Sequence, residues 1–109
     1  KLAETALFHQ LFTAFNARYD SLNNKLAALL DERDLSQEQR GIIVDYFNLC
    51  AEEYLFYQQG YIPKSVWRSW CKGMAWYLKR HPYKDVWNDE IASESFYGLT
   101  LEKIHAGAV

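Results

Sequence analysis

Apolar side chains recur at alternating steps of four and three residues along the first third of the chain. They are Phe8, Phe12, Phe15, Tyr19, Leu22, Leu26 and Leu29. This heptad spacing is typical of a long helix that packs along its length against a nearly antiparallel neighbour. No proline interrupts the pattern, so we expect a helix from about Leu2 to Asp31. Leu7, Leu11 and Leu30 widen the stripe, which favours a helix inside one bundle. A homodimer through this helix is the alternative.

A second long helix is expected from Ser36 to about Gln59. Ser36 and Gln39 have the spacing of a capping box, in which each side chain accepts the free amide of the other residue. Gly60 supplies the left-handed residue that commonly follows a helix. Apolar positions cover most of this helix, so we expect it to be central. They are Ile42, Ile43, Tyr46, Phe47, Leu49, Cys50, Tyr54 and Tyr57.

The run Gly60 to Pro63 predicts a tight corner, with Pro63 in the first turn of a third helix that extends to about Arg80. Pro82 is expected to end or bend that helix, because proline cannot continue the hydrogen-bond pattern. A shorter fourth helix is expected from Tyr83 to Ala92. The inward positions of the third and fourth helices are Val66, Trp67, Trp70, Cys71, Met74, Tyr77, Leu78, Val86, Trp87 and Ile91.

The chain lacks alternating β-branched runs and hairpin dipeptides, which excludes a fold built on strands. We therefore predict an all-α fold, a compact bundle of about four helices whose two long N-terminal helices pack as an antiparallel hairpin. Thr100 is placed to cap one last turn that carries Leu101 and Ile104. A chain of 109 residues has the size of one domain, so residues 1–109 are expected to form a single unit.

The two cysteines and the hydropathy pattern bear on the cellular compartment. Cys50 and Cys71 lie in apolar helical patterns without metal or redox spacing, so reduced core thiols are expected, with one disulfide as the alternative. No segment approaches the roughly 20 apolar residues that span a bilayer. We expect a cytoplasmic location, or the cytoplasmic side of a membrane if an anchor precedes Lys1.

Charge is distributed unevenly along the chain. The segment from Tyr54 to Lys84 has six basic residues and no acidic one, whereas the remainder holds all fourteen carboxylates and six basic residues. Lys64, Arg68 and Lys72 recur every fourth residue and therefore share one face of the predicted third helix. A solvated helical face is the ordinary explanation of such a pattern.

Aromatic residues accompany this basic face, and the pair supplies both attraction and contact area. The candidate binding residues are Tyr57, Tyr61, Lys64, Arg68, Lys72 and Trp76. We expect a non-enzymatic interaction domain that contacts a protein partner or a second copy of itself. A membrane surface is the alternative, and nucleic acid is disfavoured.

A polar stripe on the second helix supports another hypothesis. Asp45, Asn48 and Glu52 share one face, and a ligand pocket or enzyme site around Asn48 and Glu52 is the second candidate. The same stripe could instead form an ion-pair seam with the basic helix. Glu52 and Glu53 are adjacent and point about 100° apart on a helix, so they are not a catalytic pair. No motif for a metal, cofactor or catalytic nucleophile is present, so none is predicted.

Several short segments together resemble one family. They are Asn48-Leu49-Cys50-Ala51-Glu52-Glu53-Tyr54, Gly60-Tyr61-Ile62-Pro63, Val66-Trp67, Trp70 and Gly73-Met74. The chain resembles small bacterial helical proteins of unknown function, some of which carry an amino-terminal membrane anchor. The resemblance covers about Leu7 to Leu99, with Glu94 to Gly98 similar to the closing loop of that family. It implies a helical domain at the cytoplasmic side of a membrane and no catalytic residue.

Overall fold

The computed structural model describes residues 2–109, with side chains from Thr5 onward, and is all-helical in this range. Its elements are α1 (Leu2–Ala28), α2 (Gln37–Gln58), α3 (Lys64–Leu78), α4 (His81–Glu90), a 3₁₀ turn (Ile91–Ser93) and α5 (Leu101–Gly107). The predicted all-α class is therefore confirmed, but the described chain has five α-helices where about four were expected.

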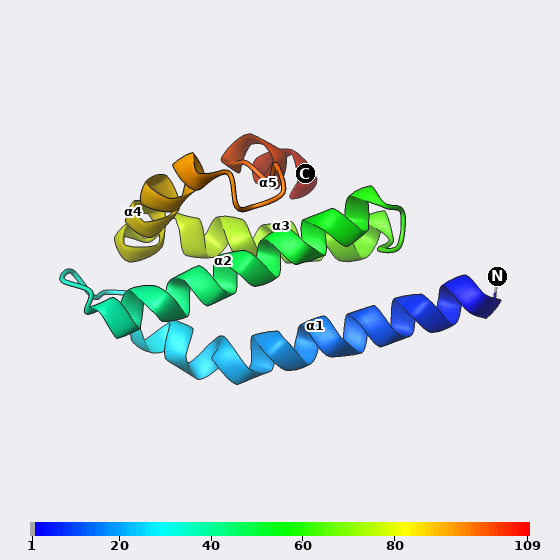
Figure 1. Cartoon of the computed structure of the whole chain (residues 1–109), viewed down its shortest axis with the longest axis horizontal. Coiled ribbons are helices and arrows are strands. Elements are labelled where there is room, and N and C mark those ends of the chain that lie inside the picture. Colours follow the sequence, from blue (N-terminus) through cyan, green and yellow to red (C-terminus); the bar gives the residue numbers. More distant parts are fainter. Residues whose placement is uncertain (1) are drawn as a thin grey trace.

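The helices form layers on either side of α2 and α3. Helices α1 and α2 lie side by side and run in opposite directions, while α4 and α5 lie beyond α2 on the side away from α1 (Figure 1). Helix α2 packs against α1, α3 and α4, and α3 packs against α2, α4 and α5. Within residues 2–109 the backbones of α1 and α3 do not come close, so these two helices meet through side chains alone.

The two long helices end as local chemistry requires. Ser36 and Gln39 form the expected capping box before α2, and Gly60 follows α2 with a φ of 86°. Helix α1 ends at Ala28 rather than Asp31, because the amides of Leu29 and Leu30 bond to carbonyls three residues earlier in a tighter turn.

The C-terminal half differs more from expectation. Pro63 is the residue before α3 rather than part of its first turn, and Pro82 lies in the first turn of α4, where its missing amide costs nothing. The predicted last turn is a two-turn helix, α5, which Thr100 caps by accepting the amide of Lys103. Its packing against α3 explains why so short a helix is stable.

Nine of the eighteen aromatic side chains are buried in the core, and five more pack against it from half-buried positions. The Phe47 and Trp87 rings meet edge to face at 5.0 Å, and Phe96 of the loop before α5 packs on both. Cys50 and Cys71 are buried free thiols, and burial raises the pKa of the Cys71 thiol to about 12, so neither is activated as a nucleophile. No helix of residues 2–109 is long and apolar enough to cross a bilayer.

Candidate functional site

A cleft of about 280 Å³ opens where α1, α2 and α3 meet. Its walls are Asn16 and Tyr19 of α1, Tyr46, Leu49 and Glu53 of α2, and Ser69, Trp70 and Gly73 of α3. The cleft exists because α1 and α3 approach only through large side chains, while α3 presents two small residues at this place. A Cβ atom built on Gly73 would meet no atom within 4 Å.

Glu53 is the acidic residue of the cleft, and only 6% of its surface is exposed. It is the one charged side chain that is buried among the described residues. No oxygen of its carboxyl is cut off from both solvent and a hydrogen-bond partner, so the carboxyl reaches the solvent of the cleft. Among the described carboxylates Glu53 is therefore the one that combines a buried side chain with a place in a cleft.

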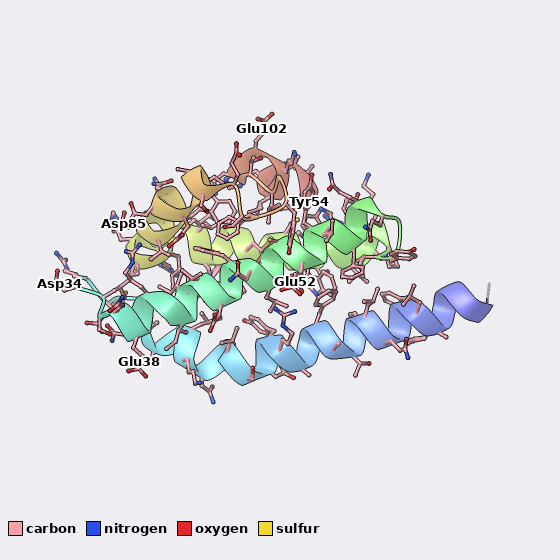
Figure 2. The ribbon with its side chains drawn as sticks, viewed as in Figure 1. Asp34, Glu38, Glu52, Tyr54, Asp85 and Glu102 are labelled. Atoms are coloured by element: carbon pink, nitrogen blue, oxygen red, sulfur yellow. The ribbon has the colours of Figure 1, made fainter. Side chains whose placement is uncertain are left out.

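The neighbouring Glu52, which the sequence suggested for a pocket, has another role. Its carboxylate accepts two hydrogen bonds from Arg18, at 2.8 and 2.9 Å, and its side chain is 36% exposed. Figure 2 shows Glu52 on the side of α2 that faces α1. Neither Glu52 nor Asn48 lines the cleft. The expected ion-pair seam between this stripe and the basic helix is wrong, because Glu52 pairs with α1.

The position of Glu53 in the helical repeat explains its burial. Tyr46, Leu49 and Glu53 follow one another at steps of three and four residues, so they share the inward face of α2. The sequence therefore contained a signal, an acidic residue at an apolar position of the repeat. Glu53 was not among the candidate residues, because sequence alone does not show which of two adjacent acidic residues is buried.

Burial also sets the proton affinity of this carboxyl. Desolvation raises the pKa of Glu53 to about 8, the nearby Arg18 opposes the rise, and the negative charge of Glu52 adds to it. At neutral pH Glu53 is therefore mostly protonated and electrically neutral. A cation placed beside it would favour the ionised form.

The rings of the cleft are held by their own contacts. The Tyr19 and Tyr46 rings lie 6.1 Å apart, and the Tyr19 hydroxyl is hydrogen-bonded to the Tyr77 hydroxyl at 3.0 Å. Trp70 meets Phe12 and Phe15 of α1 with ring centroids 6.2 and 5.8 Å away. These contacts fix the aromatic walls, so the cleft is largely preformed.

The basic residues expected at a binding surface do lie in solvent. Lys64, Arg68 and Lys72 are exposed on α3, and none forms an ion pair with an acidic side chain of the described residues. From residue 64 to residue 72 they extend over about 12 Å of helix. This is one continuous basic face, which we call the α3 basic face.

The aromatic residues expected beside this face are dispersed. Tyr57 is half-buried and stacks on Trp67 with centroids 5.0 Å apart, so it belongs to the core rather than the surface. Tyr61 is 41% exposed at the corner before α3. Trp76 is 44% exposed at the other end, and the cation over its ring is Arg80, at 4.7 Å. The structure thus does not gather the three rings around the basic residues.

A larger cleft, of about 560 Å³, lies between the α1–α2 connection and the α3–α4 junction. Its walls are Leu30, Asp31, Glu32, Arg33, Lys79, Arg80, His81, Pro82 and Asp85. Acidic and basic side chains are mixed in its walls and almost all are exposed. The cleft therefore has neither a surface of one charge sign nor an isolated buried charged group. It is the weaker candidate in spite of its size.

Comparison with known proteins gives no relative: no family model, no curated protein and no solved structure matches this chain. Within residues 2–109 no three His, Cys, Asp or Glu side chains are grouped so that they could hold a metal ion. The cleft and the α3 basic face are therefore the two features on which a function can be based.

Proposed function

We propose that this chain is a small ligand-binding domain and that the cleft between α1, α2 and α3 receives a small molecule or one side chain of a partner. The observation that carries the proposal is Glu53, whose side chain is only 6% exposed and whose carboxyl lines the cleft beside aromatic rings. A hydrogen bond to a charged group contributes about 1.5–3 kcal/mol, so a ligand that donates to this carboxyl would gain affinity. The cleft contains no second carboxyl and no histidine, so binding fits it better than acid–base catalysis.

The antiparallel hairpin of α1 and α2 is the frame of this proposed site. Arg18 and Glu52 join the two helices by a bidentate ion pair, close to Tyr19 and Glu53 in the sequence. Helix α3 completes the site with Ser69, Trp70 and Gly73. In this view every helix that lines the cleft supplies at least one polar atom or aromatic face.

Nuclear magnetic resonance with a library of small fragments tests the proposal. We expect the fragments that bind to shift the indole N–H signal of Trp70 and to leave the signal of Trp76 unchanged, because Trp76 lies on the outer side of α3. Gly73→Leu should abolish the shifts by filling the cleft, because there is open space at its Cβ position. Gly41→Leu is the matched control, since its Cβ position is also open but lies outside the cleft. Shifts that survive Gly73→Leu would refute the site.

The α3 basic face supports a second candidate function, the binding of an acidic protein segment. Its support is that Lys64, Arg68 and Lys72 are exposed and unpaired among the described residues. Surface charge of one sign increases the rate and salt dependence of association with an opposite charge.

A labelled polyglutamate peptide is a suitable probe of that face. We expect its binding to weaken as salt is added and to disappear when Lys64, Arg68 and Lys72 are all changed to glutamate. The same charge reversal at Lys25, Arg33 and Lys84, which are exposed elsewhere, is the control. Equal loss in both variants would mean that net charge alone acts, and binding to anionic vesicles in preference to the peptide would assign the face to a membrane.

A homodimer through α1 remains a separate prediction. Phe15, Leu26 and Leu29 of its heptad stripe are buried inside the single chain, which leaves only the half-buried members for a second copy. Light scattering at rising protein concentration tests it, and a constant monomer mass would exclude the dimer.

A further inference from the structure

We infer that the cleft selects an organic cation with N–H donors, namely a primary alkylammonium group, which binds between the aromatic walls with its nitrogen at Glu53. This inference rests on the proposed function, because it names the ligand class of the same cleft. Three features of the described residues carry it: the composition of the walls, the pairing of the nearest arginine and the ionisation of Glu53.

The walls attract positive charge. Tyr19, Tyr46 and Trp70 line the cleft, and an aromatic face attracts an ammonium ion within about 6 Å of its centre. No lysine, arginine or histidine lines the cleft, so nothing there would repel a cation or bind an anion. A carboxylate ligand would meet Glu53 with no basic group among the walls of the cleft, and we therefore exclude anions.

The cation nearest to Glu53 already has a partner. Both terminal nitrogens of Arg18 donate to Glu52, at 2.8 and 2.9 Å, so Arg18 acts on Glu53 through its charge and not through a hydrogen bond. The titratable groups that act on Glu53 or line its cleft come from all three helices. They are Arg18 and Tyr19 of α1, Tyr46, Cys50 and Glu52 of α2, and Cys71 of α3. Arg18 is the only member of this set that carries a positive charge.

Binding of an ammonium ion should release a proton. Free Glu53 is mostly neutral at pH 7 because its pKa is about 8, and an ammonium ion binds its ionised form. As pH is raised towards 8, the affinity should therefore increase about tenfold for each pH unit, and above pH 8 it should level off. A neutral ligand of the same shape should show no such rise.

The experiment titrates the full chain with n-butylammonium, 1-butanol and butyrate at about pH 6, 7 and 8.5, following the Trp70 indole signal. We expect n-butylammonium to bind best, with about a tenfold gain from pH 6 to 7. Calorimetry in two buffers of different ionisation enthalpy should show nearly one proton released at pH 7. This second measurement uses the unaltered protein and does not depend on the folding of a variant.

Two variants isolate the carboxyl. Glu53→Gln keeps the shape of the side chain but cannot ionise, so it should abolish the preference for n-butylammonium over 1-butanol and its pH dependence. Asp45→Asn removes the same charge from an exposed position two turns earlier on α2 and should leave both unchanged. Gly-Lys-Gly with both termini blocked and free n-butylammonium compare the two sources of the group, a lysine side chain and a free amine.

The possible failures are distinct. If 1-butanol or butyrate binds as tightly as n-butylammonium, or if pH has no effect, the cleft binds ligands but the inference of a cation is wrong. Equal binding of tetramethylammonium overturns the requirement for an N–H donor. If no probe of any charge shifts the Trp70 signal and the fragment library also fails, the proposed function itself is wrong.

Discussion

Replacing Glu53 by glutamine should stabilise the protein, and the gain should grow with pH. In the unfolded chain the carboxyl has its ordinary pKa of 4.5, whereas burial raises the pKa in the folded protein to about 8. Between these values the folded protein keeps a proton that the unfolded chain releases, so the free energy of unfolding falls as pH rises. Below 4.5 and above 8 both states carry the same charge at this position, and the effect is constant.

The size of the effect follows from the two pKa values. Each pH unit inside the window lowers the free energy of unfolding by about 1.4 kcal/mol, and the whole window is worth about 5 kcal/mol. Between about pH 5.5 and 7.5 the advantage of Glu53→Gln over the original protein should therefore grow by about 3 kcal/mol. Glutamine does not titrate, so the other carboxyl groups cancel in the difference between the two proteins.

Urea unfolding followed by tryptophan fluorescence measures both proteins at each pH. Asp45→Asn is the control, because it removes a carboxyl from an exposed position on the same helix. A gain for Glu53→Gln that stays constant within about 0.5 kcal/mol across this range would refute the argument, since it would mean that Glu53 titrates alike in both states.

Four further substitutions test the packing and the helix ends, each by urea unfolding. Gly107→Ala should cost about 1–3 kcal/mol, because its Cβ would lie 2.5 Å from the Cys71 sulfur. Gly41→Ala, which meets no atom within 4 Å, should instead gain about 0.5–1 kcal/mol, and equal signs for the two would contradict the packing of α5. Ser36→Ala should cost about 1 kcal/mol through loss of the capping box, and no loss would show that α2 begins without it. Tyr83→Phe should cost about 1 kcal/mol because its buried hydroxyl donates to the Leu26 carbonyl, and an unchanged midpoint would mean that this bond contributes nothing.

Local chemistry made the N-terminal half of the fold predictable. The heptad stripe of α1 and the capping box at Ser36 depend only on residues within a few turns of one another, and both are present in the structure. Helix α5 was predicted as a single turn because its seven residues have no local reason to remain helical. Its stability comes from its packing against α3, and a local sequence pattern does not predict a contact between distant segments.

The candidate site was harder to predict for a related reason. Two adjacent acids look alike in sequence, but Glu52 meets Arg18 from α1 while Glu53 points between three helices. Which of the two acidic side chains is buried depends on how α1 and α3 lie on either side of α2. Tyr57 illustrates the same limit, since its stacking on Trp67 requires the corner at Gly60 to bring α3 back over α2.

The side-chain contact between α1 and α3 has a consequence for how the cleft would admit a ligand. Asn16 and Tyr19 belong to α1. Ring contacts such as that of Phe15 with Trp70 set the distance between α1 and α3. The backbones of α1 and α3 do not come close, so α1 is held in the bundle by α2 and by these rings. The width of the entrance is then a property of aromatic packing, and amides of α1 should exchange with solvent sooner than those of α2.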